Sequence, residues 1–364
     1  MQLRAMKETE LAVAAALADL IFRDDEQTSM GDAFPPIFQT AMSHSFGAFA
    51  EDGRLAAFMG LVPSVLRIGN ARLNVFSIGS VCTHPDFRGQ GLASRSLELC
   101  KAHADASGAS LIFVSGDRSL YTRAHCNPFG RVTRFTPRHE DIGRLRVPHA
   151  AGSGYSVRPF ERSDIFALQS LVSSRVVAFE RSVADLGEWL DAAAYASRLK
   201  LEHRVLVALD GAGRAEAYAV LAVPGAAKAK SSPVVIEWAG SPAAMAALLA
   251  DALERYELSS LGLTVEWHEG ETARLFQEAG LASESAANAG TVYIVNADRL
   301  YQQAQPYGSH PTGLKFTAAD AAYRLEQPDG ARCSSLPPSL PLTGSTLPPI
   351  IRRKHAIQSF RRLT

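Results

Sequence analysis

The sequence predicts an α/β protein with a mixed sheet, built as two tandem copies of one fold and followed by a tail. Strand-like apolar runs alternate with amphipathic helical runs along most of the chain. The order of these elements repeats after about 150 residues. A chain of 364 residues is also long enough for two domains. We therefore expect domains at residues 1–150 and 151–303 and a tail at 304–364.

Composition excludes several classes of function. Lys and Arg number 37, Asp and Glu also number 37, and this zero net charge argues against a nucleic-acid partner. The four cysteines show no Cys-x-x-Cys spacing, so neither a metal site nor a disulfide framework is expected and a reducing cytoplasm fits. The apolar run at 11–22 is too short for a signal peptide or a membrane span and follows acidic residues, so no membrane partner is expected.

The first half is read from hydrophobic periodicity and turn residues. Its expected elements are a strand at 2–6, a helix at 7–22, a polar loop at 23–31, a short helix at 34–42, a hairpin of strands at 45–50 and 54–65, a long strand at 73–83, a helix at 89–107, a strand at 110–115, a short helix around Tyr121, and a closing strand at 130–137. A linker rich in small residues follows at 144–154.

The second half repeats this order. We expect a strand near 155–159, helices at 163–179 and 183–199, a hairpin of strands at 204–209 and 216–223, a strand at 234–238, a helix at 242–256, a strand at 261–267, a helix at 269–279, and a closing strand at 291–295. The tail reads as a hairpin at 314–327, then an extended segment rich in Ser and Pro at 334–349 and a basic end.

The most informative stretch runs from the strand at 73–83 into the helix at 89–107. Pro85 and Asp86 break the strand, and Arg88-Gly89-Gln90-Gly91-Leu92-Ala93 leads into the helix. A helix N-terminus presents unpaired N–H groups and a partial positive charge, and glycines let an anion approach them closely. Arg88 adds a permanent charge with a planar fork of donors. This pattern predicts a pyrophosphate site. An ordinary strand–helix turn with a capping glycine has a similar sequence and is the alternative interpretation.

Two motifs together resemble a known family. The string Arg88-Gly89-Gln90-Gly91 after an apolar strand resembles the coenzyme A loop of the GNAT acetyltransferase superfamily, and the strand at 110–115 followed by a short helix with Tyr121 resembles its second signature. The sequence lacks the Lys-Ser/Thr of a Walker A loop and the Gly-x-Gly-x-x-Gly of a dinucleotide site. The tandem arrangement resembles the enhanced-intracellular-survival (Eis-like) acetyltransferases over residues 1–300. The fold class expected is therefore two tandem GNAT folds. The second is degenerate, because Ala239-Gly-Ser-Pro242 replaces the Arg-Gly-x-Gly turn.

The resemblance implies an acetyl-CoA-dependent N-acetyltransferase that uses acetyl-CoA as co-substrate and no metal. Arg88 and the backbone from Gly89 through Gln90, Gly91 and Leu92 to Ala93 match the pyrophosphate site. Val81, Cys82 and Thr83 match the strand end that aligns pantetheine and the thioester, and Ser115 matches a further cofactor contact. Tyr121 matches the general acid that protonates the leaving thiolate, against an alternative role in packing.

The general base is left open. The strand from Arg72 to Asp86 contains no carboxylate between these residues, so water-mediated deprotonation is the first choice. His44 is an alternative base, and Ser80 can hold a water.

The acceptor is also left open, as a primary amine of a small molecule or peptide. Phe34, Phe38 and Met42 either line its pocket or pack in the core. Competing hypotheses are a non-catalytic coenzyme A-binding module and transfer of a longer acyl group. Relatives often form hexamers, so a homo-oligomer is one option.

Overall fold

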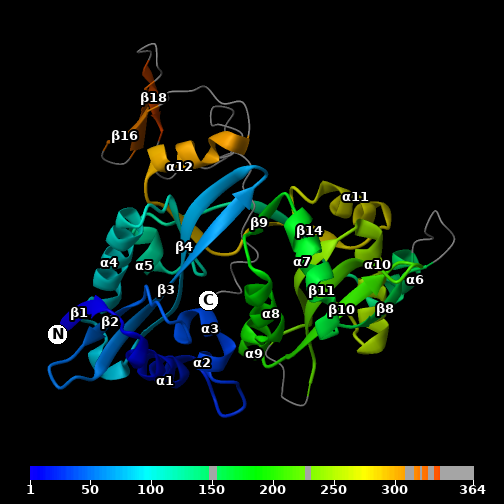
Figure 1. The fold of residues 1–364 in the computed structure, drawn as a ribbon, viewed down its shortest axis with the longest axis horizontal. Helices are drawn as coiled ribbons and strands as arrows, with labels where there is room; N and C mark the ends of the chain where they lie inside the picture. The colour runs from blue at the N-terminus through cyan, green and yellow to red at the C-terminus, as the bar shows by residue number, and fades with distance from the viewer. Residues whose placement is uncertain (147–153, 226–230, 308–314, 320–321, 327–331, 337–364) are drawn as a thin grey trace. The chain divides into compact units, whose positions relative to one another are not determined.

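The computed structural model describes residues 1–146, 154–225, 231–307, 315–319, 322–326 and 332–336 (Figure 1). The chain divides into two compact units, and neither is continuous in sequence. Unit 1 contains Met1–Phe22, Pro36–Gly130 and the described residues from Ala287 onward, and unit 2 contains Arg23–Pro35 and Arg131–Ala286.

Unit 1 begins as the sequence predicts. Strand β1 (Gln2–Ala5) leads through a 3-10 turn into helix α1 (Leu11–Phe22), whose Leu11, Ala14 and Ala18 are buried. Arg4 binds Glu10 through two hydrogen bonds of 2.8 and 2.7 Å, which fixes the approach of β1 to α1. The next segment differs from the expectation: helix α2 (Met30–Ala33), which belongs to unit 2, begins within the loop expected at 23–31, and α3 (Pro35–Phe38) is shorter than the helix expected at 34–42.

Three antiparallel strands form the centre of unit 1: β2 (Phe46–Phe49), β3 (Leu55–Ile68) and β4 (Ala71–Thr83). Gly53 and Gly69 take φ values of +84° and +55° in the two connecting turns, a conformation open to glycine without a steric cost. Helix α4 (Leu92–Ala106) then returns the chain to β5 (Leu111–Val114), which pairs parallel to β4. Helix α5 (Ser119–Arg123) and β6 (Asn127–Pro128) complete this stretch.

The closing strands differ from the expectation. We expected 130–137 to close the first sheet and 291–295 to close the second. Instead β15 (Thr291–Ile294) pairs antiparallel with β5 and belongs to unit 1, in the strand order β1-β2-β3-β4-β5-β15-β6. Strand β7 (Arg131–Phe135) pairs with β13 (Leu263–Glu266) in unit 2. The two halves thus exchange their final strands.

Helix α12 (Ala297–Ala304) secures the exchanged segment in unit 1. Gln303 accepts a hydrogen bond from the Asn74 backbone N–H at 3.0 Å. Arg299 donates to the Ala109 carbonyl at 2.7 Å. Leu300 and Tyr301 are buried. These contacts attach residues far along the chain to the start of β4 and the turn before β5.

Unit 2 keeps the predicted order with a second difference in its helices. The helix expected at 163–179 ends at Ser174, and Val177–Phe179 is strand β9; the helix expected at 183–199 is split in two. The elements are α6 (Ile142–Leu145), β8 (Ser156–Pro159), α7 (Ile165–Ser174), α8 (Val183–Asp191), α9 (Ala194–Arg198), β10 (Glu202–Leu209), β11 (Ala215–Val223), β12 (Val234–Gly240), α10 (Pro242–Arg255), α11 (Gly270–Glu278) and β14 (Ser283–Ala287). The sheet order is β12-β11-β10-β8, with β13-β7-β14 as a separate sheet.

The tail contains the expected hairpin. Strands β16 (Lys315–Ala319) and β17 (Ala322–Glu326) pair antiparallel, and β18 (Arg332–Leu336) pairs with β17. The expected segment at 334–349 lies largely outside the described residues, and the basic end lies entirely outside them. Within the described ranges, no helix combines the length and apolar character needed to span a bilayer.

Candidate active site

The central feature of unit 1 is a bulge near the end of β4. Phe58 is opposite Cys82, but Gly60 is opposite Gly79, so Met59 faces both Ser80 and Val81. Ser80 takes a φ of +50°, which is uncommon for a residue other than glycine. Gly60 permits this packing, since a Cβ there would lie 2.8 Å from the Gly79 carbonyl oxygen.

Beside the bulge, β4 and β5 part. Their parallel pairing runs from Val75 opposite Leu111 to Ile78 opposite Val114, where β5 ends, while β4 continues to Thr83. The last residues of β4 therefore extend past the end of β5, and this opening between the strands is called the seam below. Val81 and Thr83 are half-buried and Cys82 is buried, so the three predicted thioester-aligning positions lie along the seam.

The predicted anion turn lies between the seam and α4. His84 accepts a hydrogen bond from the Asp86 backbone N–H, and a 3-10 turn at Pro85–Phe87 leads to Arg88. Arg88, Gly89, Gln90 and Gly91 are all exposed. The Arg88 guanidinium forms no ion pair with any residue that the structure describes.

Two glycines of this turn need the left-handed region. Gly89 has φ +78° and Gly91 has φ +69°, and nothing lies within 4 Å of the place where either Cβ would stand. Gly91 is the N-cap of α4 and supplies no side-chain acceptor, so the N–H groups of the first helical turn stay uncapped. Leu92 is buried and anchors the turn, while Ala93 is half-buried. The result is an open, positively polarised helix end.

Tyr121 lies on α5, and its side chain belongs to the apolar cluster that packs against α4. Its side chain is buried beside Cys126, Leu97 and Cys100. The ring passes over Gly116, where an added Cβ would be 3.3 Å from the ring. Burial raises the pKa of Tyr121 to about 12, so the phenol is protonated at neutral pH. Ser115, the other predicted residue of this region, is half-buried directly after β5.

The structure places the alternative base, His44, and the three candidates for the pocket wall in different surroundings. His44 Nδ1 lies 2.9 Å from His103 Nε2, and burial, together with His103, lowers the pKa of His44. Phe38 stacks on Phe58 with ring centroids 5.5 Å apart, and Phe34 is buried, so both pack in the core. Met42 alone of the three aromatic or sulfur-bearing candidates is open to solvent, at 73 % exposure.

The bulge was not predicted from the sequence. The signal was present, since Gly79-Ser80 interrupts an otherwise apolar strand and a glycine inside a strand often marks a bulge. The same holds for Gly116, whose lack of a side chain makes room for the Tyr121 ring.

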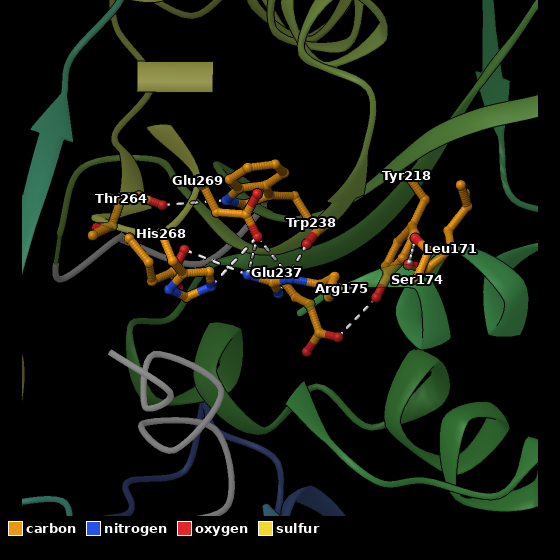
Figure 2. A network of polar contacts seen from close by, with 10 residues as sticks. Leu171, Ser174, Arg175, Tyr218, Glu237, Trp238, Thr264, His268 and Glu269 are labelled. Carbon is orange, nitrogen blue, oxygen red and sulfur yellow. Dashed lines mark hydrogen bonds and ion pairs between the residues drawn. The ribbon is translucent and has the colours of Figure 1, made fainter. Parts of the chain in front are cut away.

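Unit 2 has a corresponding strand with the same irregularity but a filled seam. In β12, Val220 is opposite Glu237 and Leu221 is opposite Val235, which leaves one extra residue as in β4. Val234 of β12 forms an isolated parallel bridge with Gly262, the residue before β13. Beyond it the Trp238 indole N–H donates to the Thr264 carbonyl at 3.2 Å (Figure 2).

Buried charges complete this filling. Arg175 donates to the Trp238 carbonyl at 3.3 Å and lies 3.3 Å from Glu269 (Figure 2). It also lies 3.5 Å from Glu266. Glu237 accepts from Tyr218 at 2.8 Å and from Arg181 at 3.0 Å. The backbone carbonyls that an open seam would offer to a ligand, those of Trp238 and Thr264, therefore already accept hydrogen bonds from side chains of this protein. No cluster of three metal-ligating side chains occurs among the described residues.

Comparisons with known proteins agree with this geometry. Residues 2–124 match a family model described as an acetyltransferase (GNAT) domain. No curated protein matches the sequence. That family match supports the class of acyltransferases: residues 2–124 are similar to a GNAT acetyltransferase domain.

Solved structures extend the likeness over the whole chain. A probable N-acyltransferase from Enterococcus faecalis V583 has a TM-score of 0.66 at 14 % identity, covering 92 % of this chain and 85 % of that one. Eis1 from Mycobacterium abscessus has a TM-score of 0.63 at 13 % identity, covering 98 % and 97 %. A GCN5-related N-acetyltransferase from Anabaena variabilis has a TM-score of 0.65 at 11 % identity, covering 100 % and 95 %. At these identities the likeness establishes a shared fold and nothing beyond it.

Proposed function

We propose that this protein transfers an acetyl group from acetyl-CoA to a primary amine of a small molecule or peptide, by direct attack in unit 1. The observation that carries the proposal is the open seam of β4 placed next to an uncapped, glycine-lined helix end. A pyrophosphate and a thioester are joined by a long, flexible pantetheine arm, and these two features accommodate its two ends.

The cofactor is held at the turn. Arg88 has no competing carboxylate among the described residues, and the first N–H groups of α4 point out of a turn with no side chains over Gly89 and Gly91. An anion at a helix N-terminus gains from both the free donors and the macrodipole. The backbone from Gly89 to Ala93 therefore binds the pyrophosphate, and Arg88 neutralises its charge.

The thioester is aligned at the seam. Val81, Cys82 and Thr83 continue β4 after β5 has ended, so no strand among the described residues pairs with them on that side, and their backbone groups there can pair with pantetheine. Backbone donors that are fixed before the reaction stabilise the oxyanion that forms on the acyl carbonyl. Ser115 lies at the end of β5, on the opposite side of this opening.

Tyr121 donates the proton to the leaving thiolate. A thiol in water has a pKa of about 8.5, so a phenol with a pKa near 12 is a poor acid for protonating its thiolate. Burial, however, raises thiol pKa values in the same unit, to about 12 for Cys82 and about 11 for Cys126. A thiolate that leaves inside the seam is less well solvated than in water, so its pKa rises toward that of Tyr121.

The acceptor amine loses its proton to water. No Asp or Glu lies on β4, and His44 already shares its Nδ1 with His103. Water-mediated deprotonation is therefore favoured over His44 as the base. The amine attacks as the neutral form, and its pKa near 10.4 for a lysine-like group makes the rate rise with pH.

Unit 2 takes no cofactor in this proposal, because Trp238 and Arg175 fill its seam. The protein acts in the cytoplasm on a diffusing amine, and its oligomeric state is left open.

The test is a panel of amines with the purified full chain, following thiol release from acetyl-CoA. Turnover with at least one amine, with one coenzyme A bound per chain by calorimetry, is the expected result. Tight coenzyme A binding without turnover on any amine would favour a regulatory module. Preference for a longer acyl-CoA by more than tenfold in kcat/KM would replace acetyl with that acyl group.

A further inference from the structure

Ser80 combines two unfavourable features at the point where the seam opens. Its φ of +50° lies in the left-handed region, where a side chain crowds the following carbonyl. Its residue is 7 % exposed, and its buried hydroxyl has no hydrogen-bond partner among the described residues. A glycine at this position would remove both costs, so the sequence keeps a strained side chain with an unused hydrogen-bond group.

A comparison with Ser77, on the same strand, shows which features of Ser80 go beyond ordinary burial. Ser77 is also buried with an unpaired hydroxyl, but it lies in the closed part of the sheet. It is opposite Val62 on β3 and Phe113 on β5, and so has strands on both sides. Ser80 lies two residues beyond the last β4–β5 pair, at Ile78 and Val114, and directly before Val81. Of these two serines, Ser80 is the one that lies next to the opening.

We propose that the Ser80 hydroxyl donates a hydrogen bond to the acyl carbonyl oxygen of the bound thioester. This inference rests on the proposed transferase function and adds a side-chain donor to the backbone donors of the seam. Strained residues with unsatisfied polar groups concentrate at ligand sites, because the ligand completes their interactions.

The hydroxyl keeps its proton throughout the reaction. The amine nitrogen bonds to the carbonyl carbon, and the carbonyl π electrons move to the oxygen that Ser80 contacts. When the carbonyl re-forms, the C–S bond breaks, the sulfur takes a proton from Tyr121, and the nitrogen releases its proton to water. Ser80 lowers the energy of the oxyanion without forming a covalent bond. It therefore acts on the acyl-transfer step and leaves the titrations of the acid and the amine unchanged.

Three variants of the full chain test this role: Ser80→Ala, Ser80→Gly and the matched control Ser77→Ala. Loss of one oxyanion donor lowers kcat by about 10²-fold or more. We expect this loss in both Ser80 variants, with coenzyme A affinity and the shape of the pH profile unchanged. We also expect Ser80→Gly to melt at a higher temperature than Ser80→Ala, because it removes the strain. Ser77→Ala should stay within threefold of wild type.

A second measurement reads the contact without turnover. The infrared carbonyl stretch of bound ¹³C-acetyl-CoA should move to higher frequency in Ser80→Ala than in wild type and stay unchanged in Ser77→Ala. The inference is overturned by an unchanged stretch, by kcat of Ser80→Ala within threefold of wild type, by an equal loss in Ser77→Ala, or by a shifted pH profile, which would assign Ser80 to proton transfer. Wild type that binds acetyl-CoA but acetylates no amine contradicts the transferase function, and the stretch then still decides on Ser80. Wild type that binds no acetyl-CoA contradicts both.

Discussion

Replacing Tyr121 with Phe removes the hydroxyl of the proposed general acid and leaves a ring of nearly the same size. General acid catalysis contributes about 10²- to 10⁴-fold, so kcat should fall by that factor while coenzyme A binding is unchanged. The raised pKa of about 12 adds a sharper expectation. The active form is the protonated phenol, so Tyr121 causes no loss of activity as the pH rises to 10.

Tyr293 provides the matched control. It lies on β15, packs against the same cluster as Tyr121, and has a raised pKa from burial, but Lys101 lies over its ring at 4.5 Å. Tyr293→Phe should keep kcat within about threefold. The assay is thiol release from acetyl-CoA from pH 6 to 10, with calorimetric coenzyme A binding for each variant. Equal kcat for Tyr121→Phe and wild type would refute the acid assignment, and so would a wild-type decline with a midpoint near pH 8 that Tyr121→Phe abolishes.

Two further predictions concern stability, measured by urea unfolding. Gly290 has φ +85°, and a Cβ there would lie 2.3 Å from the Val114 carbonyl oxygen, so Gly290→Ala should lower the free energy of unfolding by about 2–4 kcal/mol. The control Gly53→Ala has a similar φ of +84° but open space around the Cβ, so it should lower that free energy by only about 1 kcal/mol. Equal losses in the two variants would contradict the placement of β15 beside β5. Burial, with a further contribution from Arg175, lowers the pKa of His268 to about 3. Between pH 6.5 and 4.5, His268 therefore becomes protonated in the unfolded chain but stays neutral in the folded chain. Stability should therefore fall by roughly 2–3 kcal/mol over this range, and His268→Phe should remove that part of the slope; an unchanged slope would contradict the neutral, buried state of His268.

Local features of the site were predictable from the sequence, because each depends on residues close together in the chain. Gly89 and Gly91 needed left-handed conformations, and a strand followed by a short helix fixed the place of Tyr121. Helix boundaries near Arg175 were less accurate, since strand β9 occupies the end of the helix expected there. The existence of these elements follows from short-range patterns.

Strand partners were not predictable in the same way. Residues 131–135 (Arg-Val-Thr-Arg-Phe) and 291–294 (Thr-Val-Tyr-Ile) are short strands, and either fits the edge of either sheet by pattern alone. Their exchange depends on long-range contacts, such as those of Arg299 and Gln303 with the turn before β5. Gly79 signalled that a bulge could form, but the φ of Ser80 was not predictable, because it depends on how Ser80 and Val81 pair with Met59 on β3.

The central claim is that a pyrophosphate binds at the N-terminus of α4 with the help of Arg88. Calorimetric titration of coenzyme A into wild type, Arg88→Ala and Arg274→Ala tests it most directly, because Arg274 is an exposed arginine of unit 2 and its loss removes the same charge. A charge-assisted hydrogen bond contributes about 1.5–3 kcal/mol, so Arg88→Ala should weaken binding by about 10- to 100-fold. Arg274→Ala should bind as wild type does. Equal affinities for wild type and Arg88→Ala, or an equal loss in both variants, would contradict the claim.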